Sequence, residues 1–265
     1  MKKMFLSLLC AALMPASAGL AQGLDFDVLR GVDVVFLGEV HDNPHHHDNQ
    51  ARAVVVLGPS ALVFEMLLPE QAEKVTPELL DDAEALEAAL SWNDSGWPDF
   101  SMYYPIFATS EGMRIYGAQV PRDVAREAIM SGDLTSTLDG EAGQYGLTLP
   151  LALAEQDARE ALQMAAHCDA LPAEMLPGMV TAQRLRDARL AQAVVQAMRE
   201  TGGPVAVITG NGHARTDWGA PSLLPAEITS LSFGQFEDEP EAGTPFDLYV
   251  ATEAVDRDDP CAAFK

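Results

Sequence analysis

The chain has 265 residues, 48% of them hydrophobic, and a formal net charge of −24 at neutral pH. This hydrophobic content is sufficient for a buried core that needs no stapling by metals or disulfides. A surface this acidic repels nucleic acid and anionic lipid, so neither is expected as a partner.

The first residues are typical of a secretory signal peptide. Two lysines precede an apolar run over residues 4–13, and small residues follow, so we expect cleavage after Ala18 or Ala21. The apolar run is too short to span a bilayer, and Cys10 within it is a poor match for a lipid-modified cysteine. We therefore predict that residues 1–21 are removed and that residues 22–265 form one exported, periplasmic domain.

Beyond this segment, the first predicted elements form a βαβ unit. Residues 32–37 are apolar and rich in β-branched side chains, which predicts a buried strand. A helix is expected to start at Pro44, because Asn43 can cap its free N–H groups and proline at the first position loses no needed donor. The helix should end before Gly58, and a second strand is predicted over residues 61–67.

The same alternation continues towards the C-terminus. Helix is predicted over residues 121–130, and strands over residues 113–120, 204–211, 226–233 and 246–255. Helical insertions are expected at about 69–91 and 150–200; in the second, one apolar stripe comprises Leu185, Ala188, Ala191, Val195 and Met198. These elements predict an α/β fold with a largely parallel central sheet covered by helices.

Polar side chains follow three of the predicted strands where each strand ends. Glu39 and His41 follow the first strand, Glu65 lies at the end of the second, and His213 follows the Gly-Asn-Gly sequence at the end of the strand at 204–211. Ligands of open α/β sheets bind beyond the carboxyl ends of the parallel strands. We therefore expect these four side chains to share one crevice.

Two histidines and two carboxylates have three chemical uses, and their spacing does not choose among them. They can perform general acid and base catalysis, with a carboxylate fixing the tautomer of an imidazole. They can bind a divalent metal through imidazole and carboxylate groups. They can also belong to an anion or cofactor site at the N-terminus of the helix that begins at Pro44. The metal signal is weak, because neither an HEXXH motif nor a Cys/His zinc pattern is present.

The three consecutive histidines of this helix have different expected environments. His47 falls on the apolar stripe and is expected to pack in the core. His45 falls on the charged face and is expected to be exposed to solvent. His46 lies at the border between the two faces, and the sequence does not decide its environment.

Residues 91–108 hold six of the eighteen aromatic side chains of the chain. Core packing under a long loop is one interpretation, and a wall for a flat apolar ligand is the other, with a tyrosine available to ferric iron. The six are Trp92, Trp97, Phe100, Tyr103, Tyr104 and Phe107.

The sulfur-containing side chains carry weaker signals. Four methionines in helical stretches, at positions 164, 175, 179 and 198, are expected to fill the core and not to bind haem. Cys168 and Cys261 remain after signal-peptide cleavage, in a compartment where disulfides persist, and the sequence leaves their pairing open.

Four stretches, in this order, resemble the ChaN family of haem-binding proteins, which shares a superfamily with the Tiki/TraB proteins and the erythromycin esterases: FLGEVHDNPHHHDNQ, GWPDFSMYYPIFA, AQRLRDARLAQAV and ITGNGHARTDWGAP. The resemblance runs from about Leu24 to Leu224. It implies a three-layer α/β fold with helical additions, export in a Gram-negative bacterium, and haem binding linked to iron acquisition. One branch is similar to an outer-membrane lipoprotein that holds haem between two protomers through tyrosine. The implied partners are therefore haem and either a second copy of the chain or components of a haem-uptake receptor.

The resemblance also implies roles for individual residues. Tyr103 and Tyr104 are the candidate haem ligands, chosen for their aromatic surroundings. The superfamily places its active-site carboxylates and histidines at strand ends, which here are Glu39, His41, Glu65 and His213. We therefore predict an exported haem-binding protein of haem and iron uptake, with haem between the helical additions and the aromatic stretch. The alternative is an esterase-like or metal-dependent protease-like hydrolase in which His41 acts as base, His213 assists, and the same four side chains would hold any divalent metal.

Overall fold

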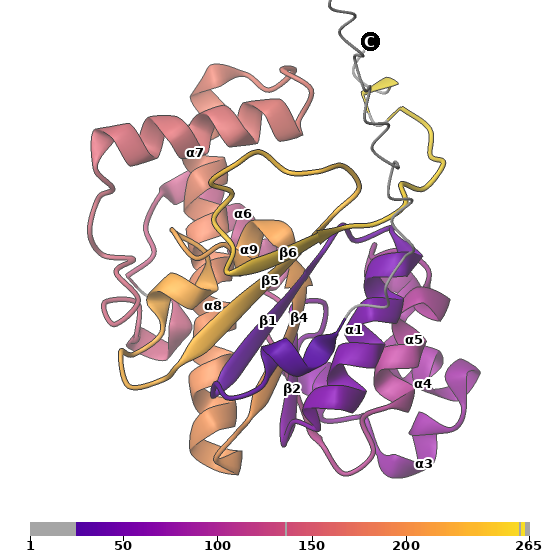
Figure 1. The fold of residues 1–265 in the computed structure, drawn as a ribbon. Coiled ribbons are helices and arrows are strands. Elements are labelled where there is room, and N and C mark those ends of the chain that lie inside the picture. The colour runs from indigo at the N-terminus through magenta and orange to yellow at the C-terminus, as the bar shows by residue number, and fades with distance from the viewer. Residues whose placement is uncertain (1–24, 136, 260, 263–265) are drawn as a thin grey trace, which may run out of the picture.

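A computed structural model of the chain describes residues 25–135, 137–259 and 261–262, so the predicted signal peptide lies outside the described residues. The described part contains a six-stranded sheet in the order β3-β2-β4-β1-β5-β6, with every pair of neighbours parallel (Figure 1). Its strands are β1 (Val34–Glu39), β2 (Ala61–Phe64), β3 (Arg114–Gly117), β4 (Val205–Gly210), β5 (Ser230–Phe236) and β6 (Leu248–Ala251). The predicted α/β fold with a parallel central sheet is confirmed.

Helices cover both faces of the sheet and make the fold three-layered (Figure 1). The first face carries α1 (Pro44–Leu57), α4 (Ala83–Leu90) and α5 (Phe100–Ala108), together with the short helices α2 (Pro69–Ala72) and α3 (Pro77–Leu80). The second face carries α8 (Leu176–Thr201), on which α6 (Arg122–Ser131) and α7 (Leu153–Ala166) pack, and α9 (Asn211–Ala214). Short 3₁₀ turns are η1 (Phe26–Leu29), η2 (Trp92–Asp94), η3 (Leu138–Gly140), η4 (Ala173–Met175) and η5 (Ala220–Leu223).

Side chains of the central strands alternate between two apolar cores. On β1, Val35 and Leu37 enter the core beneath α1 and α5, whereas Val34 and Phe36 enter the core beneath α8. This alternation follows from strand geometry, and burial on both faces explains why each central strand is a continuous apolar run in the sequence. The predicted stripe on α8 is buried except for Met198, which packs against the core from its edge.

The aromatic stretch mostly enters the first core. Trp92, Phe100, Tyr103 and Phe107 are all buried there, and the Phe107 ring stacks on Phe64 with the ring centroids 4.4 Å apart. Core packing therefore accounts for most of these aromatics. Trp97 differs, because its ring lies against His41 beyond the strand ends, with the centroids 4.9 Å apart.

Local capping explains where α1 begins and ends. The Asn43 side chain accepts a hydrogen bond from the His45 N–H at 2.9 Å, and Pro44 opens the helix as predicted. Gly58 ends α1 in the left-handed region at φ +54°, where a side chain would be strained. The start of α1, and with it the loop that carries His41, is fixed by this cap.

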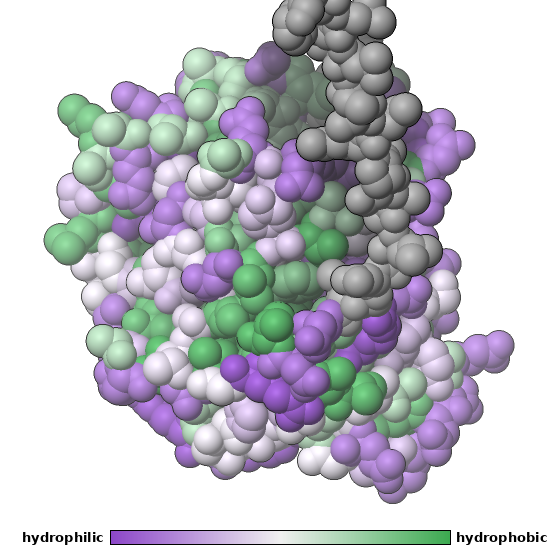
Figure 2. Space-filling model, viewed as in Figure 1, coloured by the Kyte–Doolittle hydropathy of each residue, from purple (hydrophilic) through white to green (hydrophobic). Residues whose placement is uncertain are grey.

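Two further features lie at the periphery. A disulfide joins Cys168, after α7, to Cys261 in the C-terminal tail, with the Cα atoms 5.5 Å apart, so the two cysteines left open by the sequence do pair. Hydrophilic side chains make up much of the face in Figure 2, and β6 at the sheet edge alternates half-buried and exposed residues. Among the helices that the structure describes, none is long and apolar enough to cross a membrane.

Candidate functional site

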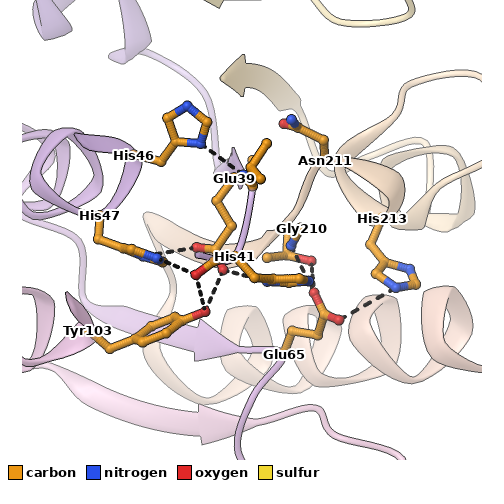
Figure 3. Close-up of polar contacts among 12 residues, drawn as sticks. Glu39, His41, His46, His47, Glu65, Tyr103, Gly210, Asn211 and His213 are labelled. Carbon is orange, nitrogen blue, oxygen red and sulfur yellow. Dashed lines mark hydrogen bonds and ion pairs between the residues drawn. The ribbon is translucent and has the colours of Figure 1, made fainter. Parts of the chain in front are cut away.

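The predicted site residues meet where the sheet changes its winding direction, between β1 and β4. The chain leaves β1 through α1 on one face of the sheet, and it leaves β4 through α9 on the other face. Such a switch point opens a crevice at the carboxyl ends of the strands. Glu39, His41, Glu65 and His213 all lie at this crevice (Figure 3).

Glu39 is the centre of the first cluster and is 2% exposed. Its Oε1 lies 2.7 Å from His41 Nδ1 and accepts a hydrogen bond from the Tyr103 hydroxyl at 2.9 Å. Its Oε2 accepts one from Gln50 Nε2 at 2.7 Å and lies 3.4 Å from His47 Nδ1. Burial alone would raise the pKa of Glu39, but His47 and His41 outweigh it and hold the pKa well below its usual range. Glu39 is therefore ionised, and both of its carboxylate oxygens have polar partners.

His41 is fixed through one ring nitrogen and presents the other to the crevice. Nδ1 faces Glu39, while a Cβ added to Gly210 would lie only 2.8 Å from Nε2, so glycine is required there. Burial lowers the pKa of His41, but the hydrogen bond to Glu39 and the charges of Glu65, Glu39 and Asp42 raise it to about 9. At neutral pH the ring is an imidazolium whose Nε2–H is available at the crevice.

Glu65 and His213 form the second cluster. The Glu65 carboxylate accepts hydrogen bonds from the Thr209 hydroxyl at 2.6 Å and from the Gly210 N–H at 2.9 Å, and its Oε1 lies 3.5 Å from His213 Nε2. The other nitrogen of His213, Nδ1, lies 2.6 Å from Asp187 Oδ1. Burial lowers the pKa of His213, but the two carboxylates beside it raise the pKa above its ordinary value. His213 is therefore an imidazole held between two acids.

Several polar residues of the site were missed by sequence reasoning. Asp187 is 3% exposed, although it lies on the buried face of α8 directly before Ala188 of the predicted apolar stripe. A buried carboxylate is stable only when it is paired, so an aspartate on the apolar face of this helix could have been predicted to have a charged or polar partner. Gln50 lies one turn after His47 on α1 and offered a similar signal, whereas nothing in the sequence pairs Thr209 with Glu65.

The remaining histidines support the loop after β1. His45 is exposed and His47 is buried, as predicted, but His47 Nε2 lies 2.8 Å from the His41 carbonyl oxygen and so belongs to the polar network. His46 accepts a hydrogen bond from the Val40 N–H at 2.8 Å, and its Nε2 lies 2.8 Å from the Thr252 hydroxyl. Burial lowers the pKa of His46 to about 4, so this ring is neutral and structural.

The same loop is also held from the C-terminal tail. The Asn43 side-chain amide donates to Glu237 at 2.8 Å and to the Glu253 carbonyl oxygen at 3.0 Å. Arg257 donates to both oxygens of Asp42, at 2.8 and 2.9 Å, and to Glu237. Residues that follow β5 and β6 therefore help to fix the loop that carries His41.

The structure places the two candidate haem-ligating tyrosines away from the crevice surface. Tyr103 is fully buried, and burial together with Glu39 raises the pKa of its hydroxyl far above the ordinary value. Tyr104 donates to the Leu80 carbonyl oxygen at 3.0 Å. Both hydroxyls already have protein partners, and their role as ligands stays a prediction.

A cleft of about 590 Å³ opens above His41, Glu65 and His213. One wall is formed by residues 95–97 of the aromatic stretch, and the opposite wall by α6 and the N-terminal half of α8. Its other lining residues include Ala125, Ile129, Met130, Met175 and Gln183, together with Arg122, Arg126 and Arg186.

Met175 is 42% exposed here, so the prediction that it fills the core is wrong. It lies at the start of α8, beside the cleft and outside the packed layer. A larger cavity of about 700 Å³, also bordered by α6, holds none of the four predicted site residues.

The arrangement does not favour a divalent metal. No group of three or more His, Cys, Asp or Glu side chains among the described residues is placed to hold a metal ion. Glu39 and Glu65 already accept hydrogen bonds from neighbouring groups.

Comparison with known proteins identifies the family. Residues 26–224 match the model of a protein family whose description is "Haem-binding uptake, Tiki superfamily, ChaN". The chain belongs to the ChaN family. The matched region contains β1 to β4 and all four predicted site residues, and the resemblance seen in the sequence is confirmed.

One solved structure supports the ChaN fold. ChaN of Campylobacter jejuni, whose structure is described as showing cofacial haem binding, matches with a TM-score of 0.60 and 17% identity, covering 83% of this chain and 88% of that chain. The type III effector HopBA1 matches with the same coverage, 13% identity and a TM-score of 0.44. A search of curated proteins finds no significant match. At 17% identity the likeness to the Campylobacter structure shows the fold alone.

Proposed function

We propose that the protein is an exported haem-binding protein of haem and iron uptake, and that haem occupies the cleft above the strand ends. The observation that carries this proposal is the make-up of the cleft, which combines apolar walls, cationic side chains and, at its floor, the imidazoles of His41 and His213. A porphyrin is flat and largely apolar, carries carboxylates, and contains an iron that imidazole can ligate. Membership of the ChaN family supports the same ligand.

His41 is the side chain in the cleft that best fits an iron ligand. A metal-ligating histidine usually donates a hydrogen bond from its other ring N–H, often to a carboxylate, and His41 Nδ1 has this relation to Glu39. When bound, the iron would supply the coordination bond, and Glu39 would hold the tautomer that leaves Nε2 free for it. Tyr103 or Tyr104 would have to leave a hydrogen-bond partner to do the same.

Unpaired polar atoms in the cleft walls also support a ligand. Trp97 Nε1 and Gln183 Oε1 are buried without a hydrogen-bond partner in the described part of the chain. Buried polar groups are rarely left unpaired in a native protein. A bound carboxylate would supply the acceptor that the Trp97 N–H lacks.

Export is proposed from residues 1–21 and is supported by the disulfide. Disulfides persist in oxidising compartments such as the periplasm and are rare in the cytosol, so the Cys168–Cys261 bond fits an exported protein. The proposed partners are a second copy of the chain or components of a haem-uptake receptor, to which haem would pass.

The proposal is tested by titrating the mature protein with hemin and following the Soret band. We expect saturable binding, unchanged in His45→Ala, whose imidazole lies on the same segment but in solvent. His41→Ala should weaken binding at least tenfold and shift the Soret maximum. Loss of binding only in the Tyr103→Phe/Tyr104→Phe double variant would assign the ligand to a tyrosine, and an unchanged Soret band in the wild type would overturn haem binding.

A hydrolase is the second candidate function, and two oriented histidines favour it. His41 is fixed by Glu39, and His213 by Asp187, as general acid–base groups require. The sequence suggested His41 as the base, but His41 is protonated at neutral pH, so it would instead donate a proton to a leaving group, while His213 faces the same cleft. Turnover of ester or peptide substrates should then disappear in His41→Ala, and equal turnover in that variant would remove this candidate.

A further inference from the structure

We infer that Arg122, Arg126 and Arg186 form a carboxylate-binding site in the strand-end cleft, which holds the two propionate groups of haem and fixes the edge by which the porphyrin enters. This inference rests on the proposed function, and it adds the recognition of the carboxylates to the ligation of iron.

The charge of the cleft is opposite to that of the molecule. The chain carries a net charge of −24, but three arginines line this cleft, and Glu65 is the one acidic side chain among its lining residues in the described part of the chain. Glu65 is already paired with Thr209, Gly210 and His213. A positive potential confined to a recess attracts anions, whereas the rest of the acidic surface repels them.

The guanidinium groups are available for a ligand. Arg126 and Arg186 form no ion pair with any acidic side chain among the described residues, and Arg122 donates to the Ser95 carbonyl oxygen. Arg30, Arg159, Arg215 and Arg257, by contrast, each pair with a nearby carboxylate. Arginine offers a planar fork that can bind a carboxylate through two hydrogen bonds, so the unpaired groups suit this anion.

The cleft has a cationic end and an apolar end along α6. Arg122 and Arg126 are one turn apart and share a face, while Ile129 and Met130 follow towards the C-terminus of the helix. From Arg122 to Met130 the helix rises about 12 Å. Met130 is 78% exposed, and Met175 lies at the same cleft, so large apolar side chains stay open to solvent there.

Haem has the same polarity, because its two propionates lie on one edge and its apolar substituents on the other edges. Binding with the propionates at the arginines would cover the methionines, and exposed apolar clusters of this kind commonly mark ligand sites. Arg186 lies on α8 directly before Asp187 and would hold the carboxylates from the helix on which α6 packs, within the same wall of the cleft.

Three ligands separate the carboxylate contribution from the iron contribution. Haem carries both groups, metal-free protoporphyrin IX keeps the carboxylates, and haem dimethyl ester keeps the iron but has no free carboxylate. Binding is followed by quenching of tryptophan fluorescence, since Trp97 lines the cleft and this readout needs no iron. We expect the wild type to bind haem at least tenfold more tightly than its dimethyl ester, and to bind protoporphyrin IX measurably.

The variants are R122Q/R126Q/R186Q and, as a matched control, R189Q, which removes a charge from the next turn of α8 outside this cleft. The triple variant should lose the preference for haem over its ester and most of its protoporphyrin affinity, whereas R189Q should keep both. If circular dichroism shows that the triple variant is unfolded, the exposed single variant R126Q should still lose several-fold of the preference.

The outcomes distinguish this inference from the proposed function. Equal wild-type affinity for haem and its ester, or a preference that survives in a folded triple variant, overturns the arginine site while haem binding stands. Failure of the wild type to bind haem, ester and porphyrin alike overturns the proposed function and the arginine site with it.

Discussion

At the scale of single residues, the protonation of His41 should control haem affinity. Its pKa is raised to about 9, and a ligating imidazole must first lose this proton. Affinity through His41 should therefore rise with pH, by up to about tenfold per unit below pH 9, and level off above it. Hemin titrations between pH 6.5 and 9.5 measure this, with His41→Ala as the pH-independent reference. A wild-type profile as flat as that of the variant would argue against His41 as the ligand.

Tyr103→Phe tests whether this tyrosine supports Glu39 structurally. The change removes a buried hydrogen bond to a carboxylate, and we expect a loss of about 1.5–3 kcal/mol in the free energy of unfolding in urea. Tyr104→Phe removes a bond to a half-buried carbonyl oxygen and should cost about 1 kcal/mol or less. If the order of the two losses is reversed, Tyr103 does not have the structural role described here.

The sequence indicates which residues follow the strands but not how they pair. Glu39, His41, Glu65 and His213 were predictable, because strand ends can be located from apolar runs and glycines. Asp187 comes from a helix more than a hundred residues from Glu65, and only the fold brings the two together at His213. The same holds for Arg186 and for the tyrosines, whose burial depends on how α5 packs on α1.

At the scale of secondary-structure elements, the N-terminus of α1 is the most vulnerable boundary near the site. Asn43→Ala removes the cap of α1 and two side-chain bonds to the C-terminal tail, and we expect a loss of about 2–4 kcal/mol in unfolding free energy. Asp82→Ala removes the exposed cap of α4 and should cost about 1 kcal/mol. Chemical denaturation compares them, and similar losses would show that the tail contacts contribute nothing.

The predicted elements differ from the observed ones mainly at their ends. Strand β1 extends from residue 34 to 39 and not from 32 to 37, because its last two residues pair with β4 although Gly38 and Glu39 do not have strand-forming side chains. The helical stretch predicted at 69–91 is divided into three helices. The first begins at Pro69 and the second at Pro77, and each proline lies in the first turn of its helix.

At the scale of the whole molecule, the disulfide should contribute much of the stability. It closes a segment with a sequence separation of 93 residues, and loops of this length lose much conformational entropy in the unfolded chain when they are cross-linked. The Cys168→Ser/Cys261→Ser variant should lose about 2–5 kcal/mol. Thermal unfolding of the oxidised wild type, the reduced wild type and the variant measures this. The last two should agree, and a variant as stable as the oxidised protein would contradict the expectation.

The contacts between the loop after β1 and the C-terminal tail have a consequence for how the chain can be recombined. The family match ends at residue 224, whereas Glu237, Thr252 and Arg257, which hold Asn43, His46 and Asp42, all lie beyond it. A hybrid whose tail came from a distant relative would keep every side chain of the cleft but would lose the partners of the loop. In evolution, therefore, residues 42–46 and the tail are expected to change together, even though only the first lies in the region that defines the family.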